Sequence, residues 1–300
     1  MEAIMTDSLL SAYSQKPAVP RLSATVIVVR QSGRSGADRR QLPEPRMSGA
    51  ASLHSGDQGS LSMEHGIEQE YSALAGYEVL LAKRALTLRV LPGFMVFPGG
   101  VLEESDMDRV RNWMEDTSGE QEPLRTLPSA PDGFALSGGT VLSRSVTRNE
   151  LYYSLLVGAL RELFEETGLR ILDSLDVSAL SPIASGGTTV RYFGRRVTPE
   201  RVRYRFDTHY FVAEAPASAK QDLQLAESEF EMALWATPQD ILSAQDTGSY
   251  LLAPPTVDAL SALCAYTSIE TLLRHGVLPA QRDDDNRIDQ FIAQTTKPVK

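Results

Sequence analysis

The 300-residue chain has a single cysteine, Cys264. One cysteine cannot form a disulfide within the chain, and it excludes a zinc site built from several thiolates. The absence of a disulfide framework fits a reducing compartment, so we expect a cytoplasmic protein and leave an organellar location open. Cys264 lies in an expected helix with no candidate base beside it, and we interpret it as a small core residue.

Positive charge is also in deficit, because 29 Lys and Arg face 39 Asp and Glu, and the net charge is −10. A uniformly acidic protein binds the phosphate backbone poorly, so we expect no nucleic-acid partner. No apolar run approaches the roughly 18 residues that cross a bilayer, so we expect no membrane partner. The N-terminal stretch has early acidic residues and no basic region, which is not typical of a secretory or transit peptide. A homo-oligomer stays open.

Two stretches contain too few apolar residues to form a core of their own. Gly, Ser, Pro and Arg dominate residues 31–70, which we interpret as a flexible insertion. A second irregular stretch covers 103–148 and contains one expected helix at 106–114. The expected organisation is a flexible arm at 1–21, one domain at 22–275 with insertions at about 31–75 and 107–148, and a C-terminal tail at 276–300.

β-Branched residues concentrate in two runs, 23–30 and 77–83, which we predict to be buried, paired strands. A turn, a short strand and a Gly-Gly corner are expected at 92–100. Gly168 is a natural end for a helix at 149–167. The remaining expected elements are strands at 188–193, 203–212 and 231–235, a helix opened by Thr237 and Pro238, and a last helix at 254–275. Strands and helices in this irregular order predict an α+β fold and not a doubly wound sheet.

Three carboxylates share one face of the helix at 149–167. On a helical wheel Glu162, Glu165 and Glu166 fall within an arc of about 100°. A separate apolar stripe facing the core is formed by Leu156, Leu160 and Leu163. Each carboxylate pair costs about 3 kcal/mol at roughly 5 Å, and the helix C-terminus disfavours acids. A hard divalent cation such as Mg²⁺ or Mn²⁺ would relieve this repulsion. A solvated acidic face is the simpler interpretation of such a helix taken alone.

The sequence around these acids matches a longer motif. Residues 161–169 read RELFEETGL and fit every specified position of R-E-U-x-E-E-x-G-U, where U is aliphatic. Upstream stand the residues FPGG at 97–100, and Asp106 stands where the motif has Glu. These are the two halves of the Nudix box, separated here by a long insertion. In this order they resemble the Nudix hydrolase family over roughly residues 22–275, outside the two insertions.

The resemblance implies both a fold and a chemistry. It implies an α/β/α sandwich with a mixed sheet, two long loop insertions and a C-terminal helix. It implies hydrolysis of a diphosphate bond with Mg²⁺ or Mn²⁺ held by Glu162, Glu165 and Glu166. Arg161 falls where the arginine of the family braces the acidic cluster.

A second pattern suggests a branch of that family. Residues 80–100 resemble the signature of coenzyme A diphosphatases, L-L-T-x-R-[SA]-x3-R-x3-G-x3-F-P-G-G, with Ala82 in place of Thr. Stretches 196–213, 234–242 and 251–260 are similar to the mammalian acyl-CoA diphosphatases, which also split the box. The resemblance implies cleavage of coenzyme A or acyl-CoA to 3′,5′-ADP and (acyl-)4′-phosphopantetheine. The residues it assigns to substrate binding are Arg84, Arg89, Gly99 and Gly100.

Several arginines gather in and beside the strands expected at 188–212. They are Arg191, Arg195, Arg196, Arg201, Arg203 and Arg205. Arginine forks suit phosphate groups, so this basic cluster is a candidate for binding the 3′-phosphate of coenzyme A. A solvated strand edge with charged residues explains the cluster equally well.

Acids on the helix and outside it are candidates for accepting the proton of the attacking water. Glu166 is one candidate. The segment AESEFEMALW offers Glu227, Glu229 and Glu231. In many Nudix enzymes an acid stands six residues before a tryptophan, as Glu229 does here. We therefore take Glu229 as a candidate general base.

Other interpretations stay open. A Nudix hydrolase for ADP-ribose or another nucleoside diphosphate would share the metal site and differ in its pocket. A non-catalytic nucleotide-binding Nudix module would usually have lost one of the acids, and all three are present. His209, in the sequence FDTHYF, is interpreted as a packed or surface strand residue.

Overall fold

The computed structural model describes residues 18–33, 76–115, 129–131, 134, 145–172, 190–202, 204–216, 223–281 and 285–295. Most of the expected N-terminal arm and of the two insertions lies outside these residues. Across the described ranges, no helix is both long enough and apolar enough to cross a bilayer.

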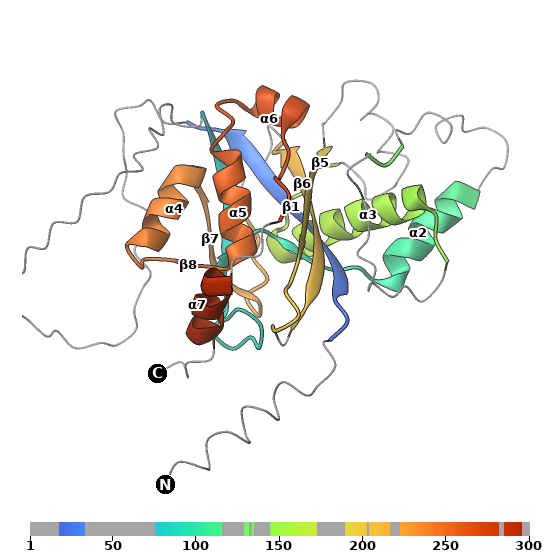
Figure 1. The fold of residues 1–300 in the computed structure, drawn as a ribbon. Coiled ribbons are helices and arrows are strands. Elements are labelled where there is room, and N and C mark those ends of the chain that lie inside the picture. Colours follow the sequence, from blue (N-terminus) through green and yellow to red (C-terminus); the bar gives the residue numbers. More distant parts are fainter. Residues whose placement is uncertain are drawn as a thin grey trace, which may run out of the picture.

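Within the described residues, a mixed sheet forms the centre of the molecule (Figure 1). Its strands are β1 (Arg21–Gln31), β2 (Tyr77–Arg84), β3 (Phe94–Val96), β4 (Gly99–Val101), β5 (Val190–Val197), β6 (Phe206–Glu214), β7 (Phe230–Ala236) and β8 (Leu251–Leu252). The order is β5-β6-β1-β2-β3-β8, with β4 paired to β1 and β7 paired to β2. The β1–β6 and β3–β8 pairs are parallel, and the others are antiparallel. This arrangement confirms the α+β prediction and the pairing of the first two strands.

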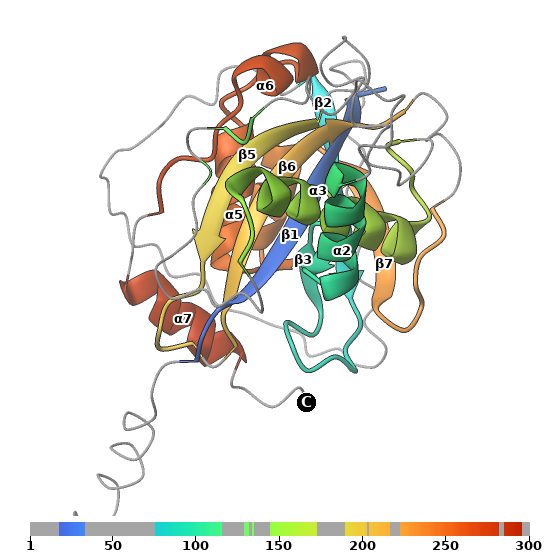
Figure 2. The ribbon, with the colours of Figure 1, turned by 90° about the vertical axis from the view of Figure 1, so that its right-hand side faces the viewer.

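Helices cover both faces of the sheet. They are α2 (Glu104–Glu115), α3 (Arg148–Thr167), α4 (Pro238–Asp246), α5 (Pro254–Leu263), α6 (Ile269–His275) and α7 (Asp285–Thr295). Helices α2 and α3 lie on one face, and α4 and α5 lie on the other (Figures 1 and 2). The three layers fit the sandwich that the resemblance implies.

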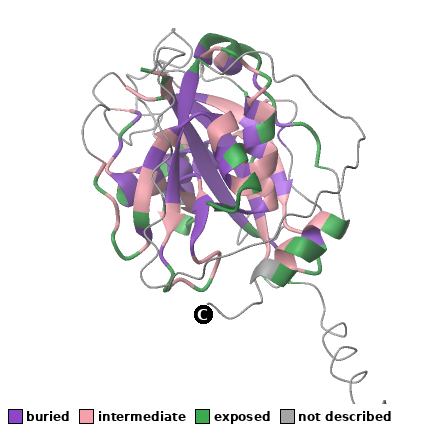
Figure 3. Ribbon diagram, turned by 90° about the vertical axis from the view of Figure 1, so that its left-hand side faces the viewer, coloured by how far each residue is buried: buried purple, intermediate pink, exposed green. Residues whose placement is uncertain are grey.

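The alternation of side chains along β1 explains why two cores form. Val26 and Val28 point into the core beneath α3, whereas Ile27 and Val29 point into the core beneath α4 and α5. All four side chains are fully buried. Burial is therefore concentrated along the central strands (Figure 3).

Helix α3 begins and ends at residues with clear capping roles. The side chain of Thr147 accepts a hydrogen bond from the Glu150 N–H, and the Glu150 carboxylate binds back to the Thr147 N–H. Gly168 has a φ of 70°, and its N–H donates to the Phe164 carbonyl at 2.8 Å. The predicted end of the helix is confirmed.

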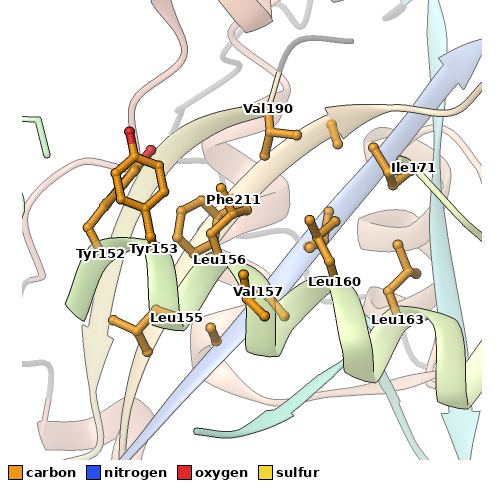
Figure 4. Packing of buried hydrophobic residues seen from close by; sticks show 14 of the residues in the cluster. Tyr152, Tyr153, Leu155, Leu156, Val157, Leu160, Leu163, Ile171, Val190 and Phe211 are labelled. Carbon is orange, nitrogen blue, oxygen red and sulfur yellow. The ribbon is translucent and has the colours of Figure 1, made fainter. Parts of the chain in front are cut away.

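The apolar stripe predicted for this helix faces the sheet. Leu156, Leu160 and Leu163 are at most 4% exposed and project from α3 toward the strands (Figure 4). Burying each such side chain contributes about 1.5–3 kcal/mol, so this stripe fixes the rotation of α3 about its axis. That rotation decides which acidic side chains of α3 can face away from the core.

The local structure differs from the expected elements in three places. The helix expected at 254–275 is two helices, because Ser268 accepts a hydrogen bond from the Thr271 N–H and starts α6 anew. The tail expected at 276–300 contains α7, whose apolar residues recur at helical spacing. The corner expected at Gly99 and Gly100 is the short strand β4, held against β1.

Cys264 is the C-cap residue of α5 and is half-buried, not deep in the core. Burial raises the pKa of its thiol to about 11, so at neutral pH it is a poor nucleophile. The cysteine therefore carries no evident chemistry.

Candidate active site

A cavity of about 1280 Å³ opens where β3, β4, α3, α5 and α7 meet. Seven of the site residues predicted from sequence line it: Arg84, Arg89, Gly99, Gly100, Glu162, Glu166 and Glu229. The side chains of Arg161 and Glu165 do not. The structure thus brings together residues that are up to 145 positions apart, the separation of Arg84 and Glu229.

Glu166 is the most deeply buried acid of the cavity, at 4% exposure. Its carboxylate accepts a hydrogen bond from the Gly99 N–H at 2.8 Å. Burial, with a smaller contribution from the neighbouring Glu162 and Glu229, raises the pKa of Glu166 to about 8, against the opposing Gly99 N–H and Arg84. The fold therefore holds the Glu166 carboxyl group at a position where nearby positive charge and hydrogen-bond donors are too few to stabilise its charged form.

The two glycines of FPGG bring the backbone of β4 close to its neighbours. Gly99 has a φ of 154°, and a Cβ there would lie 2.4 Å from the Ala24 carbonyl oxygen. A Cβ on Gly100 would lie 2.3 Å from the Glu162 carboxyl group. Only glycine allows this approach, which places a backbone N–H and two carboxylates at one corner of the cavity.

Arg161 binds acidic side chains of both α2 and α3. It makes a bidentate ion pair with Asp106, with both N–O distances at 3.0 Å. The same guanidinium contacts Glu162 at 3.1 Å and Glu165 at 3.0 Å. The bond to Asp106, which is 1% exposed, raises the pKa of Arg161 above its ordinary value. The guanidinium thus holds Asp106, Glu162 and Glu165 together, and the sequence did not identify Asp106 as its partner.

Glu162 and Glu165 differ in their surroundings. The Glu162 side chain is 19% exposed, and burial raises its pKa against the opposing charge of Arg161. The Glu165 side chain is 54% exposed and turns toward Arg161. The three acids share an arc of the helix, but only Glu162 and Glu166 face the cavity. Within the part of the chain that the structure describes, no three acidic, histidine or cysteine side chains are already placed to hold a metal ion.

Glu229 completes the acidic corner of the cavity. It lies close enough to Glu162 and Glu166 to raise the pKa of both. Glu231 is instead paired with Lys83 at 2.8 Å, and Glu227 is exposed away from the cavity. Of the three acids in that segment, Glu229 alone faces the cavity.

The two arginines of the signature occupy different environments. The Nε–H of Arg84 donates to the Val90 carbonyl at 3.0 Å, and its guanidinium lies 5.9 Å from the centre of the Phe230 ring. Its charge lowers the pKa of Glu166. The Arg89 side chain is exposed at the cavity wall and makes no hydrogen bond or ion pair with another described residue. Arg89 is therefore the better placed of the two to meet an anionic ligand.

The basic cluster expected along the strands is not one anion site. Arg191 donates to carbonyls at the end of α6, and Arg195 makes a bidentate pair with Asp207. Arg205 donates to the carbonyls of Thr198 and Ala18. The two members that line the cavity are each ion-paired, Arg196 with Asp258 and Arg201 with Asp289. Arg203 lies outside the described residues. These arginines mainly join elements of the fold.

His209 is a packed strand residue, which is one of the two alternatives that the sequence left open. It is fully buried, and its Nδ1 shares a hydrogen bond of 3.1 Å with the Tyr192 hydroxyl. Its Nε2 finds no hydrogen-bond partner among the described residues. Burial lowers the pKa of His209 to about 4, so the ring is neutral at pH 7.

No protein-family model matches the chain. Among solved structures it resembles a Nudix hydrolase from Alicyclobacillus acidocaldarius, with a TM-score of 0.51 and 22% identity over 87% of this chain and 98% of that one. It also matches the Nudix domain of Shewanella oneidensis NrtR complexed with ADP ribose, with a TM-score of 0.38 and 12% identity over 86% of this chain and 96% of that one. A third match is an Ap4A hydrolase from C. elegans, with a TM-score of 0.34 and 11% identity over 91% of this chain and 98% of that one. The first likeness covers nearly the whole of both chains, and it shows that the chain has the fold of Nudix hydrolases.

Proposed function

We propose that this protein is a metal-dependent hydrolase of nucleoside diphosphate derivatives. The observation that carries the proposal is the acidic corner of the cavity. There Glu166 is buried beside Glu162 and Glu229, and burial and mutual repulsion raise the pKa of the first two acids. Carboxylates that are held together despite burial and mutual repulsion suit a hard divalent cation, whose preferred ligands are oxygen atoms.

The donor set fits Mg²⁺ or Mn²⁺. We assign Glu162, Glu165 and Glu166 as ligands. Glu165 now pairs with Arg161, so it joins the others only by giving up that ion pair. When bound, the metal would neutralise phosphate charge and lower the pKa of a water molecule.

Residues of the chain position the proposed metal ligands and take up the proton of the attacking water. Arg161 orients Glu162, and the Gly99 N–H orients Glu166. In the hydrolysis a water oxygen bonds to one phosphorus, and the bridging oxygen leaves with the other phosphate. We assign Glu229, which lines the cavity and lies outside α3, as the acceptor of that proton.

We further propose coenzyme A or an acyl-CoA as the substrate, with 3′,5′-ADP and (acyl-)4′-phosphopantetheine as products. The support comes from the signature residues Arg84, Arg89, Gly99 and Gly100, all of which line the cavity. The exposed guanidinium of Arg89 suits the 3′-phosphate that distinguishes coenzyme A from dephospho-CoA and ADP-ribose.

A substrate panel tests this proposal. Coenzyme A, dephospho-CoA and ADP-ribose are compared with Mg²⁺ or Mn²⁺, and products are separated by chromatography. A charge-assisted contact to the 3′-phosphate is worth about 1.5–3 kcal/mol, so kcat/KM should fall roughly 10- to 150-fold for dephospho-CoA. Arg89→Gln should abolish this difference. Arg109→Gln, an exposed position of α2 away from the cavity, is the matched control. Equal kcat/KM for all three substrates would refute coenzyme A and leave diphosphate hydrolysis standing.

A further inference from the structure

Helix α7 presents an apolar face to the cavity. Ile288, Phe291 and Ile292 have the i, i+3, i+4 spacing of one helix face, and all three line the cavity. Ile288 is 8% exposed, whereas Phe291 and Ile292 are half-buried. The ring of Phe291 meets Phe94 edge-on, with 6.0 Å between ring centres. Part of this face is therefore used to dock α7, and part is left at the cavity wall.

Ion pairs fix α7 in that position. Asp258 of α5 binds Arg287 of α7 at 2.5 Å and Arg196 of β5 at 2.9 Å. Arg287 also donates to the Pro254 carbonyl at 2.8 Å. The polar groups of this wall are thus engaged in holding α7 against α5 and β5, and the surface offered to a ligand is mainly apolar.

The apolar wall is separate from the acidic corner. Helix α7 lies near the end of α5 and apart from α3 in both views (Figures 1 and 2). Ligand cavities usually have volumes of about 300–1,000 Å³, and this one is larger. A nucleoside diphosphate bound at the acidic corner therefore leaves room for a further group, and aliphatic side chains such as Ile292, Pro254 and Pro255 surround that room.

We propose that α7 binds an alkyl chain carried by the diphosphate substrate and so selects among diphosphates. The assignment rests on the proposed function, because the chain is part of the substrate of that site. A nucleobase is the poorer occupant, since its polar edge would need hydrogen-bond partners that this wall has committed elsewhere. Covering the exposed part of the α7 face removes apolar surface from water, which is the source of the affinity.

Binding of two esters of ADP tests the proposal without relying on coenzyme A. The probes carry a butyl or an octyl group on the β-phosphate, and binding is measured by calorimetry in EDTA so that no turnover occurs. Each buried methylene is worth about 0.8 kcal/mol, so four further buried methylenes should tighten binding by about 200-fold. Ile292→Gln should reduce this ratio to about 3-fold or less.

Two variants of the same helix serve as controls. Ile292→Leu keeps the apolar surface and should keep the ratio. Ala293→Gln introduces the same amide at the next, exposed position, which does not line the cavity, and should leave the ratio unchanged. Circular dichroism checks that α7 stays folded in each variant.

The outcomes separate this proposal from the proposed function. An equal affinity for both esters, a ratio that Ile292→Gln does not change, or no binding of either ester overturns the α7 assignment. Hydrolysis with Mg²⁺ is measured in parallel. A chain-length preference without hydrolysis would refute the proposed function and support α7 as a binding element. Hydrolysis without a chain-length preference would support the proposed function and refute α7 as a binding element.

Discussion

Among single residues, the buried carboxyl group of Glu166 has a pKa that the fold shifts strongly. Its pKa is raised to about 8 from 4.5. Between pH 4.5 and 8, the folded protein therefore keeps this carboxyl group protonated, whereas the unfolded chain has released the proton. Stability should therefore fall as the pH rises from 4.5 through 8, by about 4 kcal/mol in the metal-free protein. Below pH 4.5 both states are protonated and the effect vanishes.

We expect Glu166→Gln to be more stable than the wild type at pH 9 in EDTA, with the gain vanishing toward pH 5. Chemical denaturation at a series of pH values measures this difference. Glu165→Gln is the matched control on the same helix, and its exposed carboxylate should give no such gain. A pH-independent difference for Glu166→Gln would show that the acid is not held in a crowded, buried position.

Glu229 has a separate test, because it is proposed to accept a proton and not to hold metal. Glu229→Gln should lower kcat by about 10²- to 10⁴-fold, and the acidic limb of the pH–rate profile should disappear with the base. Glu231→Gln makes the same change two residues away, at an exposed acid paired with Lys83, and should retain activity. An unchanged pH profile in Glu229→Gln would assign the proton transfer to another group.

The sequence indicated part of this site at the level of residues. The spacing on the helix predicted that Glu162 and Glu166 lie together, because a helical wheel depends on local geometry alone. It did not show that Glu165 turns outward, or that Asp106 binds Arg161 across 55 positions of the chain. Such pairings depend on how α2 packs against α3, which no local pattern encodes.

At the scale of elements, predictions succeeded where local chemistry ends a helix. Gly168 and Thr237 occupy the cap positions expected of them. The break at Ser268 was missed, because an apolar pattern continued across it. Helix α7 was missed because its few apolar residues gain little by themselves and are stabilised by contacts with Phe94 and Asp258.

The junction of α5, β5 and α7 at Asp258 has a measurable energetic role. Asp258→Asn removes the charge between Arg196, which is 6% exposed, and Arg287. Leaving a buried guanidinium without its partner should lower the free energy of unfolding by about 1–3 kcal/mol, in a denaturant titration at pH 7.

The exposed pair on α6 provides the contrast. Glu270 and Arg274 are 77% and 67% exposed, so solvent screens their interaction. Glu270→Gln should therefore change the free energy of unfolding by less than about 0.5 kcal/mol. Equal effects of Asp258→Asn and Glu270→Gln would contradict the role given to Asp258.

At the scale of the whole molecule, the fold class was predictable, but the order of the strands was not. β-Branched runs identified β1 and β2, and the connection between them suggested their pairing. The parallel pairing of β1 with β6 joins segments separated by most of the chain. Alternate residues of β1 are buried in the two cores on opposite faces of the sheet, and this burial sets the register with β6. The register therefore depends on the packing of the whole fold.

Buried His209 limits stability on the acidic side. Its pKa is lowered from 6.5 to about 4. Between pH 6.5 and 4, the unfolded chain therefore binds a proton at this imidazole, whereas the folded protein keeps the ring neutral. Stability should fall by about 3 kcal/mol as the pH drops from 6.5 to 4. His209→Gln should flatten this limb, as measured by denaturation between pH 4 and 7. His275→Gln, at an exposed position, should leave the limb in place, and the same flattening there would refute the assignment.

The acidic corner built by α3 and β4 is proposed to hydrolyse a diphosphate. The most direct measurement compares the purified wild type with the Glu162→Gln/Glu166→Gln double variant, each with Mg²⁺ or Mn²⁺ and each of coenzyme A, dephospho-CoA and ADP-ribose. We predict cleavage at the diphosphate of at least one substrate by the wild type. The double variant should lose at least about 10²-fold in kcat while keeping its circular dichroism spectrum. No cleavage of any substrate by the wild type, or undiminished cleavage by the folded double variant, would contradict the claim.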